Sequence, residues 1–184
     1  MKISETGFKG LLVIEPKIFK DNRGYFFESY NEKMLKEAGI DIKFVQDNQS
    51  KSSFGVIRGL HYQLEPYAQT KLIRVLQGTI RDVVADIRKG SPTFGKWFGV
   101  EISDDNQKQL LIPRGFAHGF SVISETAVIL YKCDDFYNPV SERGIIYNDT
   151  TLGINWGLNP EQAIVSEKDL KHPSFDQAEY NFTF

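Results

Sequence analysis

The chain has 184 residues, 41% of them hydrophobic, which is enough for one domain with a substantial apolar core. Its 22 Lys and Arg residues nearly balance its 24 Asp and Glu residues, so it lacks the positive field expected of a protein that binds duplex nucleic acid. The single cysteine, Cys133, excludes an internal disulfide bond. Because no apolar run approaches the roughly 18 residues of a membrane span, and residues 1–10 do not resemble a signal peptide, we expect a cytoplasmic protein.

Short apolar runs alternate with turn residues along most of the chain, a pattern typical of a β-sandwich or barrel. Strands are expected, in chain order, at residues 10–16, 24–30, 43–49, 55–63, 71–78, 79–88, 96–103, 108–113, 118–124 and 126–133. A helix is expected at residues 31–39, with Asn31 as its N-cap and Gly39 at its end, and a helical turn or two within residues 159–173. We therefore predict a mainly β protein in which residues 1–184 form one jelly-roll (double-stranded β-helix) sandwich with a few short helices.

The predicted strand at residues 55–63, GVIRGLHYQ, carries Arg58 and His61 among apolar residues. Strict alternation places these two side chains on opposite faces of the strand, unless Gly59 introduces a bulge. A histidine in an apolar strand is commonly a structural residue with satisfied hydrogen bonds, but it can also be a metal ligand or a base. The neighbouring polar residues have to distinguish these alternatives.

Lys71, Tyr131 and His118 each lie within an apolar strand, and alternation places them on the same face as the apolar residues two positions away. Burying charged or polar groups is costly unless they are paired or used. Several such groups in one small barrel therefore predict a polar cavity that binds an anionic ligand.

Residues 113–118 resemble the second motif of the cupin family, Pro-x-Gly-x-x-His, and cupins often bind a metal. The first cupin motif needs two histidines two residues apart, which would direct both imidazoles at one ion. Here these positions are His61 and Gln63, and glutamine is a poor metal ligand. The remaining histidine, His172, lies far along the chain from both motifs. The sequence therefore predicts no metal site and disfavours a metal-dependent oxygenase or isomerase.

The chain resembles the dTDP-4-dehydrorhamnose 3,5-epimerase family within the cupin-like jelly rolls. The resemblance extends from about residue 7 to 173. It rests on these stretches, in family order: DNRGYFFESYN, FVQDNQSKS, GVIRGLHYQ, KLIRVLQG, SPTFGKWFGVEIS, IPRGFAHGF, YKCDDFYNP, ERGIIYND, LGINW and VSEKD. It implies a homodimer that acts on a dTDP-sugar in dTDP-L-rhamnose biosynthesis, with no metal or other cofactor.

The resemblance also implies the roles of individual residues. His61 matches the proton-abstracting base, Asp169 the carboxylate that orients it, and Tyr131 the proton donor. Lys71 and Arg58 match cationic groups near the sugar and its diphosphate, and Lys71 suits a developing enolate oxygen. Further substrate contacts are implied for Arg23, Glu28, Gln46, Asp47, Asn48, His118, Glu142 and Lys168.

Four positions depart from the usual family pattern, at Thr70, Asp134, Tyr147 and Thr150. Two alternatives remain open besides the metal enzyme: an epimerase acting at C3 or C5 alone on a related dTDP-sugar, and a non-catalytic cupin that binds a sugar nucleotide. The four proposed catalytic groups occurring together disfavour the second.

Alternation within residues 79–88 turns Asp82 toward the interior. Because an unpaired buried carboxylate is costly, we expect Asp82 to pair with the imidazole of His118. Such a pair would keep His118 cationic beside Lys71.

Overall fold

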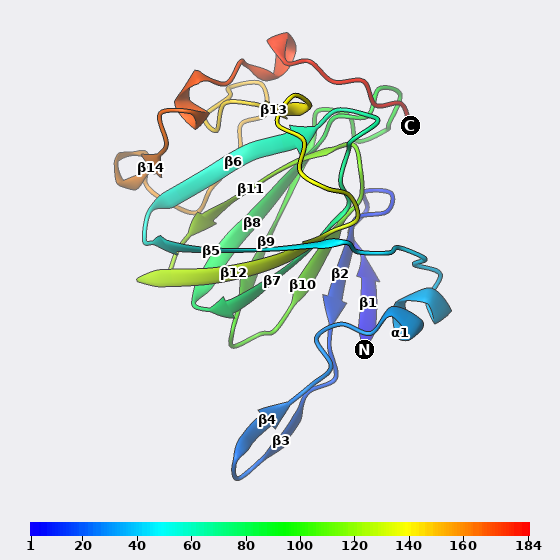
Figure 1. The fold of residues 1–184 in the computed structure, drawn as a ribbon. Helices are drawn as coiled ribbons and strands as arrows, with labels where there is room; N and C mark the ends of the chain where they lie inside the picture. The colour runs from blue at the N-terminus through cyan, green and yellow to red at the C-terminus, as the bar shows by residue number, and fades with distance from the viewer.

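The computed structural model describes all of residues 1–184 and consists mainly of two β-sheets packed face to face as a sandwich (Figure 1). The first sheet has the strand order β1 (Lys2–Glu5), β2 (Leu12–Glu15), β10 (Gln109–Ile112), β7 (Lys71–Gln77), β12 (Thr126–Cys133) and β5 (Gln46–Ser53). The second sheet has the order β13 (Glu142–Gly144), β6 (Val56–Gln63), β11 (Phe116–Val122), β8 (Thr79–Asp86) and β9 (Trp97–Ser103), with β14 (Ile164–Val165) parallel to β6. The predicted mainly β sandwich is confirmed.

The apolar core between the sheets is built from alternate residues of facing strands, including Ile73 and Ile129 of the first sheet and Phe120 of the second. Lys71 lies two residues before Ile73, and Tyr131 lies two residues after Ile129. The same alternation therefore turns these two polar side chains toward the interior, as predicted.

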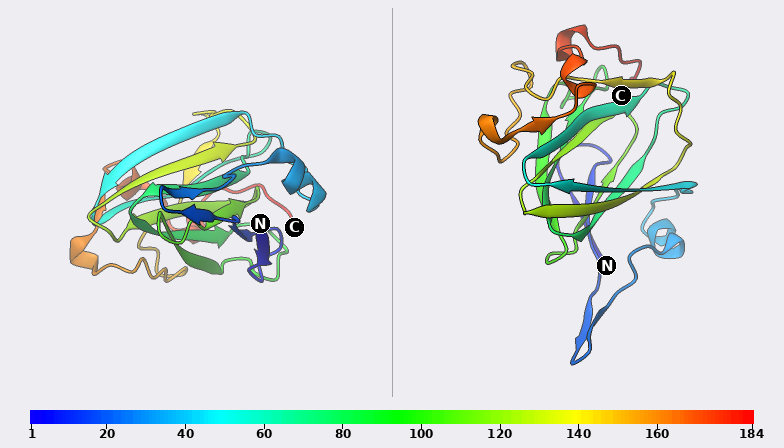
Figure 2. Two further views of the ribbon diagram at one scale, coloured as in Figure 1. Left: turned by 90° about the horizontal axis from the view of Figure 1, so that it is seen from below. Right: turned by 60° about the vertical axis from the view of Figure 1, so that its left-hand side comes forward.

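The chain after β13 covers the outer face of the second sheet (Figures 1 and 2). It contains three short 3₁₀ helices, η1 (Pro160–Gln162), η2 (Asp169–Lys171) and η3 (Phe175–Gln177). The first two confirm the helical turns expected within residues 159–173, and η3 was not predicted. Trp156 and Phe175 of this segment form a second core with Ile57 and Leu60 of β6. The second sheet is thus buried on both faces, which fixes the position of η2 against β6.

A two-stranded hairpin, β3 (Phe19–Asp21) with β4 (Gly24–Phe26), projects away from the sandwich (Figures 1 and 2). The strand expected at 24–30 is therefore shorter than predicted and lies outside the sandwich, where Phe26 is 67% exposed. The following helix α1 (Glu32–Glu37) begins and ends as expected. The side chain of Asn31 accepts a hydrogen bond from the backbone N–H of Met34, and Gly39 has a φ of +83°.

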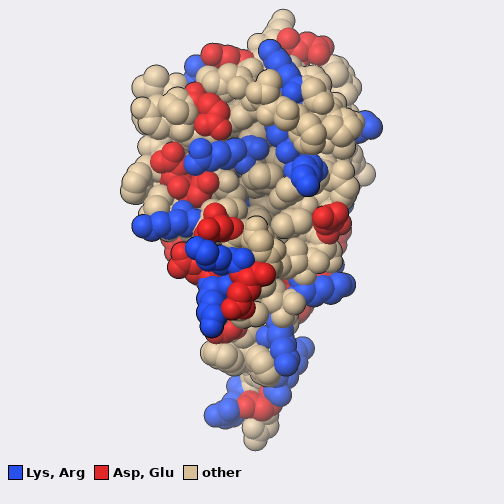
Figure 3. All heavy atoms as spheres, turned by 90° about the vertical axis from the view of Figure 1, so that its right-hand side faces the viewer, with Lys and Arg blue, Asp and Glu red and all other residues tan.

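Strands β1, β3, β13 and β14 were not predicted. They are two to four residues long, so each is defined by its pairing partner rather than by a local pattern. Figure 3 shows acidic and basic side chains interspersed over one face of the molecule, in keeping with the balanced composition. None of the helices has the length and apolar character needed to cross a membrane.

Candidate active site

A bulge in β6 places Arg58 and His61 on the same side of the second sheet. In the pairing of β11 with β6, His118 lies opposite His61 and Phe120 lies opposite Arg58, so two steps along β11 match three along β6. Gly59 has a φ of +124°, and a Cβ at this position would lie 2.5 Å from the backbone of β11. Glycine is therefore required at the bulge, and the extra residue resolves the conflict that strict alternation predicts.

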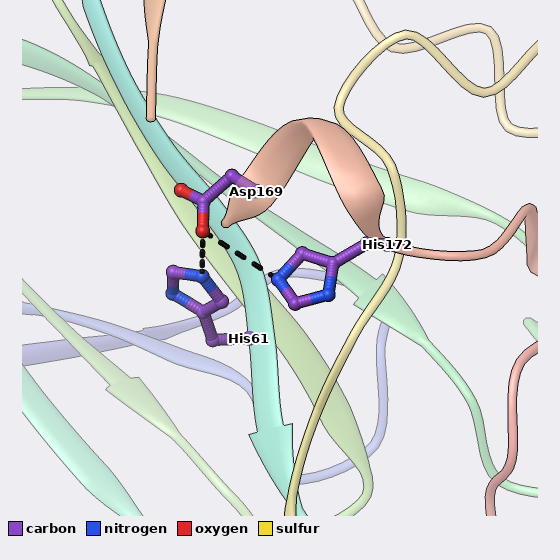
Figure 4. A group of neighbouring side chains, drawn as sticks. All are labelled: His61, Asp169 and His172. Atoms are coloured by element: carbon purple, nitrogen blue, oxygen red, sulfur yellow. Dashed lines mark hydrogen bonds and ion pairs between the residues drawn. The ribbon is translucent and has the colours of Figure 1, made fainter. Parts of the chain in front are cut away.

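The imidazole of His61 is held by Asp169, the first residue of η2 (Figure 4). Nε2 of His61 lies 2.8 Å from Oδ1 of Asp169, a residue that is only 4% exposed. Oδ2 of Asp169 accepts a hydrogen bond of 3.4 Å from the backbone N–H of Gly59. Burial by itself would raise the pKa of Asp169, but the hydrogen bond and charge of His61, with the Gly59 N–H, hold that pKa below 3.8. The ionised carboxylate accepts a hydrogen bond from the N–H at Nε2 of His61, which leaves Nδ1 free to accept a proton.

His172, which lies far along the chain from both cupin-like motifs, is close to His61 and Asp169 in space. Its Nε2 is 3.5 Å from Oδ1 of Asp169, and its ring packs edge-on against the ring of His61 with centroids 5.4 Å apart (Figure 4). Burial, followed by the positive charge of His61, lowers the pKa of His172. The one local signal was its position three residues after Asp169, because a helical turn brings such residues together.

A pocket of about 230 Å³ between the two sheets contains the side chain of His61. Its other lining residues include Lys71 on β7 and Tyr131 on β12. Gln46 and Asn48, alternate residues of β5, also line it. The predicted polar cavity is therefore present, and it has the base candidate on the second sheet and the acid candidate on the first.

Burial controls the protonation of the two polar groups on the first sheet. It lowers the pKa of Lys71 from 10.5, partly offset by negative groups that include Asp82 and Glu142. Burial likewise raises the pKa of Tyr131 above 10, so its hydroxyl is neutral and able to donate a proton at neutral pH. Nζ of Lys71 lies 6.0 Å from the centroid of the Tyr131 ring, which places a cation beside the proposed acid.

The predicted pairing of Asp82 with His118 is confirmed. Nε2 of His118 lies 2.7 Å from Oδ1 of Asp82, which is completely buried. The other carboxylate oxygen of Asp82 is buried with no hydrogen-bond partner, so the imidazole is the principal group that satisfies this carboxylate. His118 also pairs directly across the ladder with His61, which brings the pair next to the base candidate.

Three polar side chains form a network at the mouth of the pocket. Oε2 of Glu142 accepts hydrogen bonds from Nζ of Lys168 at 2.6 Å and from the hydroxyl of Tyr137 at 2.8 Å. Burial would raise the pKa of Glu142, but these two hydrogen bonds lower it. Glu142 and Tyr137 line the pocket, and Lys168 is joined to its rim through Glu142. Sequence reasoning missed Tyr137.

Gln63 has a structural role at the position where a cupin would have its second metal-binding histidine. Its side-chain amide donates to the backbone carbonyls of Tyr67 and Phe136, at 2.6 and 3.3 Å. Its side-chain oxygen accepts from the backbone N–H of Asn138 at 2.7 Å. Gln63 thus fixes the loop between β12 and β13 and is only 6% exposed.

Six of the predicted substrate contacts do not line this pocket: Arg23, Glu28, Asp47, Arg58, His118 and Lys168. Arg23 lies on the projecting hairpin, where it pairs with Asp21, and Glu28 follows the hairpin and contacts Asn31. Asp47 binds Nζ of Lys132 at 3.0 Å, on the opposite face of β5 from Gln46 and Asn48. Arg23 and Glu28 lie away from the pocket because the hairpin is separate from the sandwich. Asp47 points away from it because side chains alternate between the two faces of β5.

Two of the departures from the family pattern contact each other. Oδ1 of Asp134 accepts a hydrogen bond of 2.6 Å from the backbone N–H of Thr70, and the N–H of Asp134 donates to the Thr70 carbonyl at 3.1 Å. Arg114 lies 3.3 Å from the other carboxylate oxygen. These contacts join the start of β7 to the end of β12, directly beside Lys71.

Comparisons with known proteins identify the family of this chain. A family model described as dTDP-4-dehydrorhamnose 3,5-epimerase matches residues 5–177. The dTDP-4-dehydrorhamnose 3,5-epimerase of Shigella flexneri is 50% identical over 181 residues, which cover 98% of this chain and 99% of that one. A crystal structure of the enzyme from Elizabethkingia anophelis has 50% identity and a TM-score of 0.92, covering 97% of this chain and 99% of that one. The Legionella pneumophila enzyme, in complex with dTDP-4-keto-L-rhamnose, has 49% identity and a TM-score of 0.91, with 96% and 93% covered. The chain belongs to the dTDP-4-dehydrorhamnose 3,5-epimerase family.

Proposed function

We propose that His61 is the base in the conversion of dTDP-4-dehydro-6-deoxy-D-glucose to dTDP-4-dehydro-L-rhamnose. The C4 carbonyl of the sugar acidifies the protons at C3 and C5, and removal of either gives an enolate. Nδ1 of His61 accepts the proton, because Nε2 is already engaged by Asp169 at 2.8 Å. Asp169 then stabilises the imidazolium that forms.

Inversion at each carbon requires that a proton return from the opposite face of the sugar ring. Tyr131 supplies it, because this residue lines the pocket from the first sheet while His61 lines it from the second. This opposed placement of base and acid is the observation that carries the proposal. Lys71 stabilises the enolate oxygen between them.

The dTDP group of the substrate occupies the polar mouth of the pocket in this proposal. Gln46 and Asn48 line that pocket, and Lys168 and Glu142 form part of its rim. Arg58, on the same side of β6 as His61, supplies charge for the diphosphate. We expect the enzyme to act in the cytoplasm.

Proton NMR of the 4-keto sugar nucleotide with enzyme in deuterium oxide tests the function. Exchange at both C3 and C5, with formation of the L-rhamno product, is expected. Exchange at one carbon would identify a single-centre epimerase of a related dTDP-sugar. Binding without exchange would identify a non-catalytic sugar-nucleotide protein, and either result would contradict the proposal.

We predict that turnover is unchanged after dialysis against a strong chelator. The proposed steps use only side chains of this chain, and the amide of Gln63 is occupied by backbone groups. Initial rates before and after dialysis provide the measurement. A loss of turnover that one added divalent metal restores would contradict the metal-free mechanism.

Asp82→Asn is predicted to lower turnover about tenfold while changing the KM less than about twofold, a loss of about 1.4 kcal/mol in the transition state. The amide removes the negative charge that pairs with the His118 imidazole, but it keeps an oxygen acceptor 2.7 Å from that imidazole. Steady-state kinetics separate the two effects. A larger change in KM than in turnover would mean that the pair is only structural.

We propose a homodimer in which the projecting hairpin of one chain reaches the pocket of the other. The hairpin projects away from its own chain's sandwich and cannot contribute Arg23 to that pocket. Its aromatic side chains Phe19, Tyr25 and Phe26 are 53%, 59% and 67% exposed. Burial of such aromatic residues is typical of an interface. This arrangement accounts for the two family positions, Arg23 and Glu28, that lie away from the pocket.

Sedimentation is expected to give twice the chain mass of 21.0 kDa, and Arg23→Ala is expected to lower kcat/KM about tenfold. Refolding Arg23→Ala chains together with an equal amount of His61→Asn chains distinguishes the two geometries. If the hairpin acts in the partner's pocket, half of the dimers are mixed and each has one complete site, so about a quarter of wild-type activity returns. If activity stays at the level of the separate variants, the hairpin does not act in the partner's pocket.

A further inference from the structure

His172 is a buried imidazole that the proposed epimerisation does not use. Its Nε2 has no hydrogen-bond partner, although its side chain is only 13% exposed. Oδ1 of Asp169 lies 3.5 Å from this nitrogen, and the same oxygen contacts Nε2 of His61 (Figure 4). His61, Asp169 and His172 each offer one atom that can bind a metal, and these three atoms lie within 4.8 Å of one another.

The space for the His172 ring depends on a glycine in the neighbouring strand. Gly144 of β13 pairs directly with His61 of β6, and a Cβ on Gly144 would lie 2.5 Å from Cδ2 and Cε1 of the His172 ring. The ring of His172 therefore lies against bare backbone, between β13 and the pair of His61 with Asp169. In this position Nε2 of His172 faces Oδ1 of Asp169, the oxygen that also contacts His61.

We propose that His61, Asp169 and His172 form a binding site for Zn²⁺. Two imidazole nitrogens and a carboxylate oxygen are ligands typical of zinc sites with one position open to water. Zinc bonds of about 2.0–2.2 Å in a tetrahedral arrangement separate neighbouring ligand atoms by about 3.3 Å. The 3.5 Å separation of Asp169 and His172 already suits this, whereas the 2.8 Å separation of Asp169 and His61 opens by about half an ångström.

Zinc at this site inhibits the enzyme by changing the tautomer of His61, a consequence that rests on the proposed role of His61 as base. Nε2 of His61 releases its proton to water and binds the metal through its lone pair, and Nδ1 takes up a proton from water, so the neutral ring carries its one proton on Nδ1. Nδ1 is the atom that must accept the proton from the sugar. Because the metal lies on the Nε2 side, behind the ring as seen from Nδ1, it lowers turnover without competing with the sugar nucleotide.

Titration of the untagged chain with Zn²⁺ in competition with a chromophoric chelator measures binding directly. One zinc per chain is expected, and His172→Gln is expected to raise the Kd at least about tenfold, as removing a ligand or its support does. His118→Gln is the matched control, since it also removes a histidine but not one of this cluster, and its Kd should equal that of wild type. Equal Kd values for wild type and His172→Gln, or no binding to wild type, would overturn the site.

Two further measurements test the consequence. In long-range nitrogen–proton NMR, zinc is expected to shift the proton of His61 from Nε2 to Nδ1. In kinetics, zinc should lower turnover with unchanged KM, and chelator should restore it, with each variant compared to its own metal-free rate. Zinc binding without epimerase activity in the metal-free chain would refute the proposed function alone. Inhibition overcome by excess substrate would refute the tautomer mechanism.

Discussion

His61→Asn is expected to reduce deuterium exchange at both C3 and C5 at least about 10³-fold, equivalent to about 4 kcal/mol in the activation barrier. Asparagine is polar and smaller than histidine, but it cannot accept a proton from carbon near neutral pH. Both exchanges should fall together, because one base serves both carbons. NMR exchange rates in deuterium oxide provide the measurement.

Binding of dTDP by the same variant is expected to change less than about threefold, since we place the nucleotide at the mouth of the pocket rather than at His61. Isothermal titration with dTDP measures this. Tyr62→Phe is the matched control: Tyr62 is the next residue in β6, and its hydroxyl donates to the backbone carbonyl of Glu179 on the opposite face. Exchange in His61→Asn above about a tenth of the wild-type rate, a loss under about 1.4 kcal/mol, would show that another base is at work.

Lys71→Met is expected to lower turnover about 10²- to 10³-fold, a loss of about 3–4 kcal/mol, because it removes the positive charge that faces the enolate oxygen. The same change should raise the free energy of unfolding by about 0.5–2 kcal/mol. Lys71 lines the pocket between the sheets, two residues from the core residue Ile73, and burial lowers its pKa, so the folded state holds this charge at a cost. Kinetics and urea unfolding measure the two opposite effects.

The sign of the pH dependence follows from the lowered pKa of Lys71. The unfolded chain binds this proton more tightly than the folded chain, so the cost is full below the folded pKa and disappears as the pH approaches the ordinary value of 10.5. The stability gained in Lys71→Met should therefore be larger at pH 7 than at pH 10. A gain that is equal at both values, or a loss of stability at pH 7, would mean that the charge of Lys71 is not held at a cost.

Local patterns in the sequence account for the sandwich and for the inward direction of its polar residues. In β7 and β12, the side-chain period of two decides that Lys71 lies on the face of Ile73 and Tyr131 on the face of Ile129. The same rule led to the pair of Asp82 with His118, because a buried carboxylate needs a partner. The role of Asp169 came from the resemblance to the family, since nothing local links this residue to His61.

The remaining features depend on contacts between segments distant in the chain. The bulge at Gly59 is set by the close approach of β11, and it turns Arg58 and His61 to one side of the sheet. The hairpin that carries Arg23 forms a separate two-stranded sheet outside the sandwich. The periodicity of its sequence does not predict this position.

The sequence by itself determined the fold class and the family, because periodicity and motifs are properties of neighbouring residues, and the resemblance to the family predicted His61 as the base. Only the tertiary structure decided that His172 joins His61 and Asp169. The packing of the tail against β6 brings η2 to the site across 108 residues of chain between His61 and Asp169, and Gly144 leaves the space for the ring. Such a contact depends on how distant surfaces pack, and local sequence carries no record of that packing.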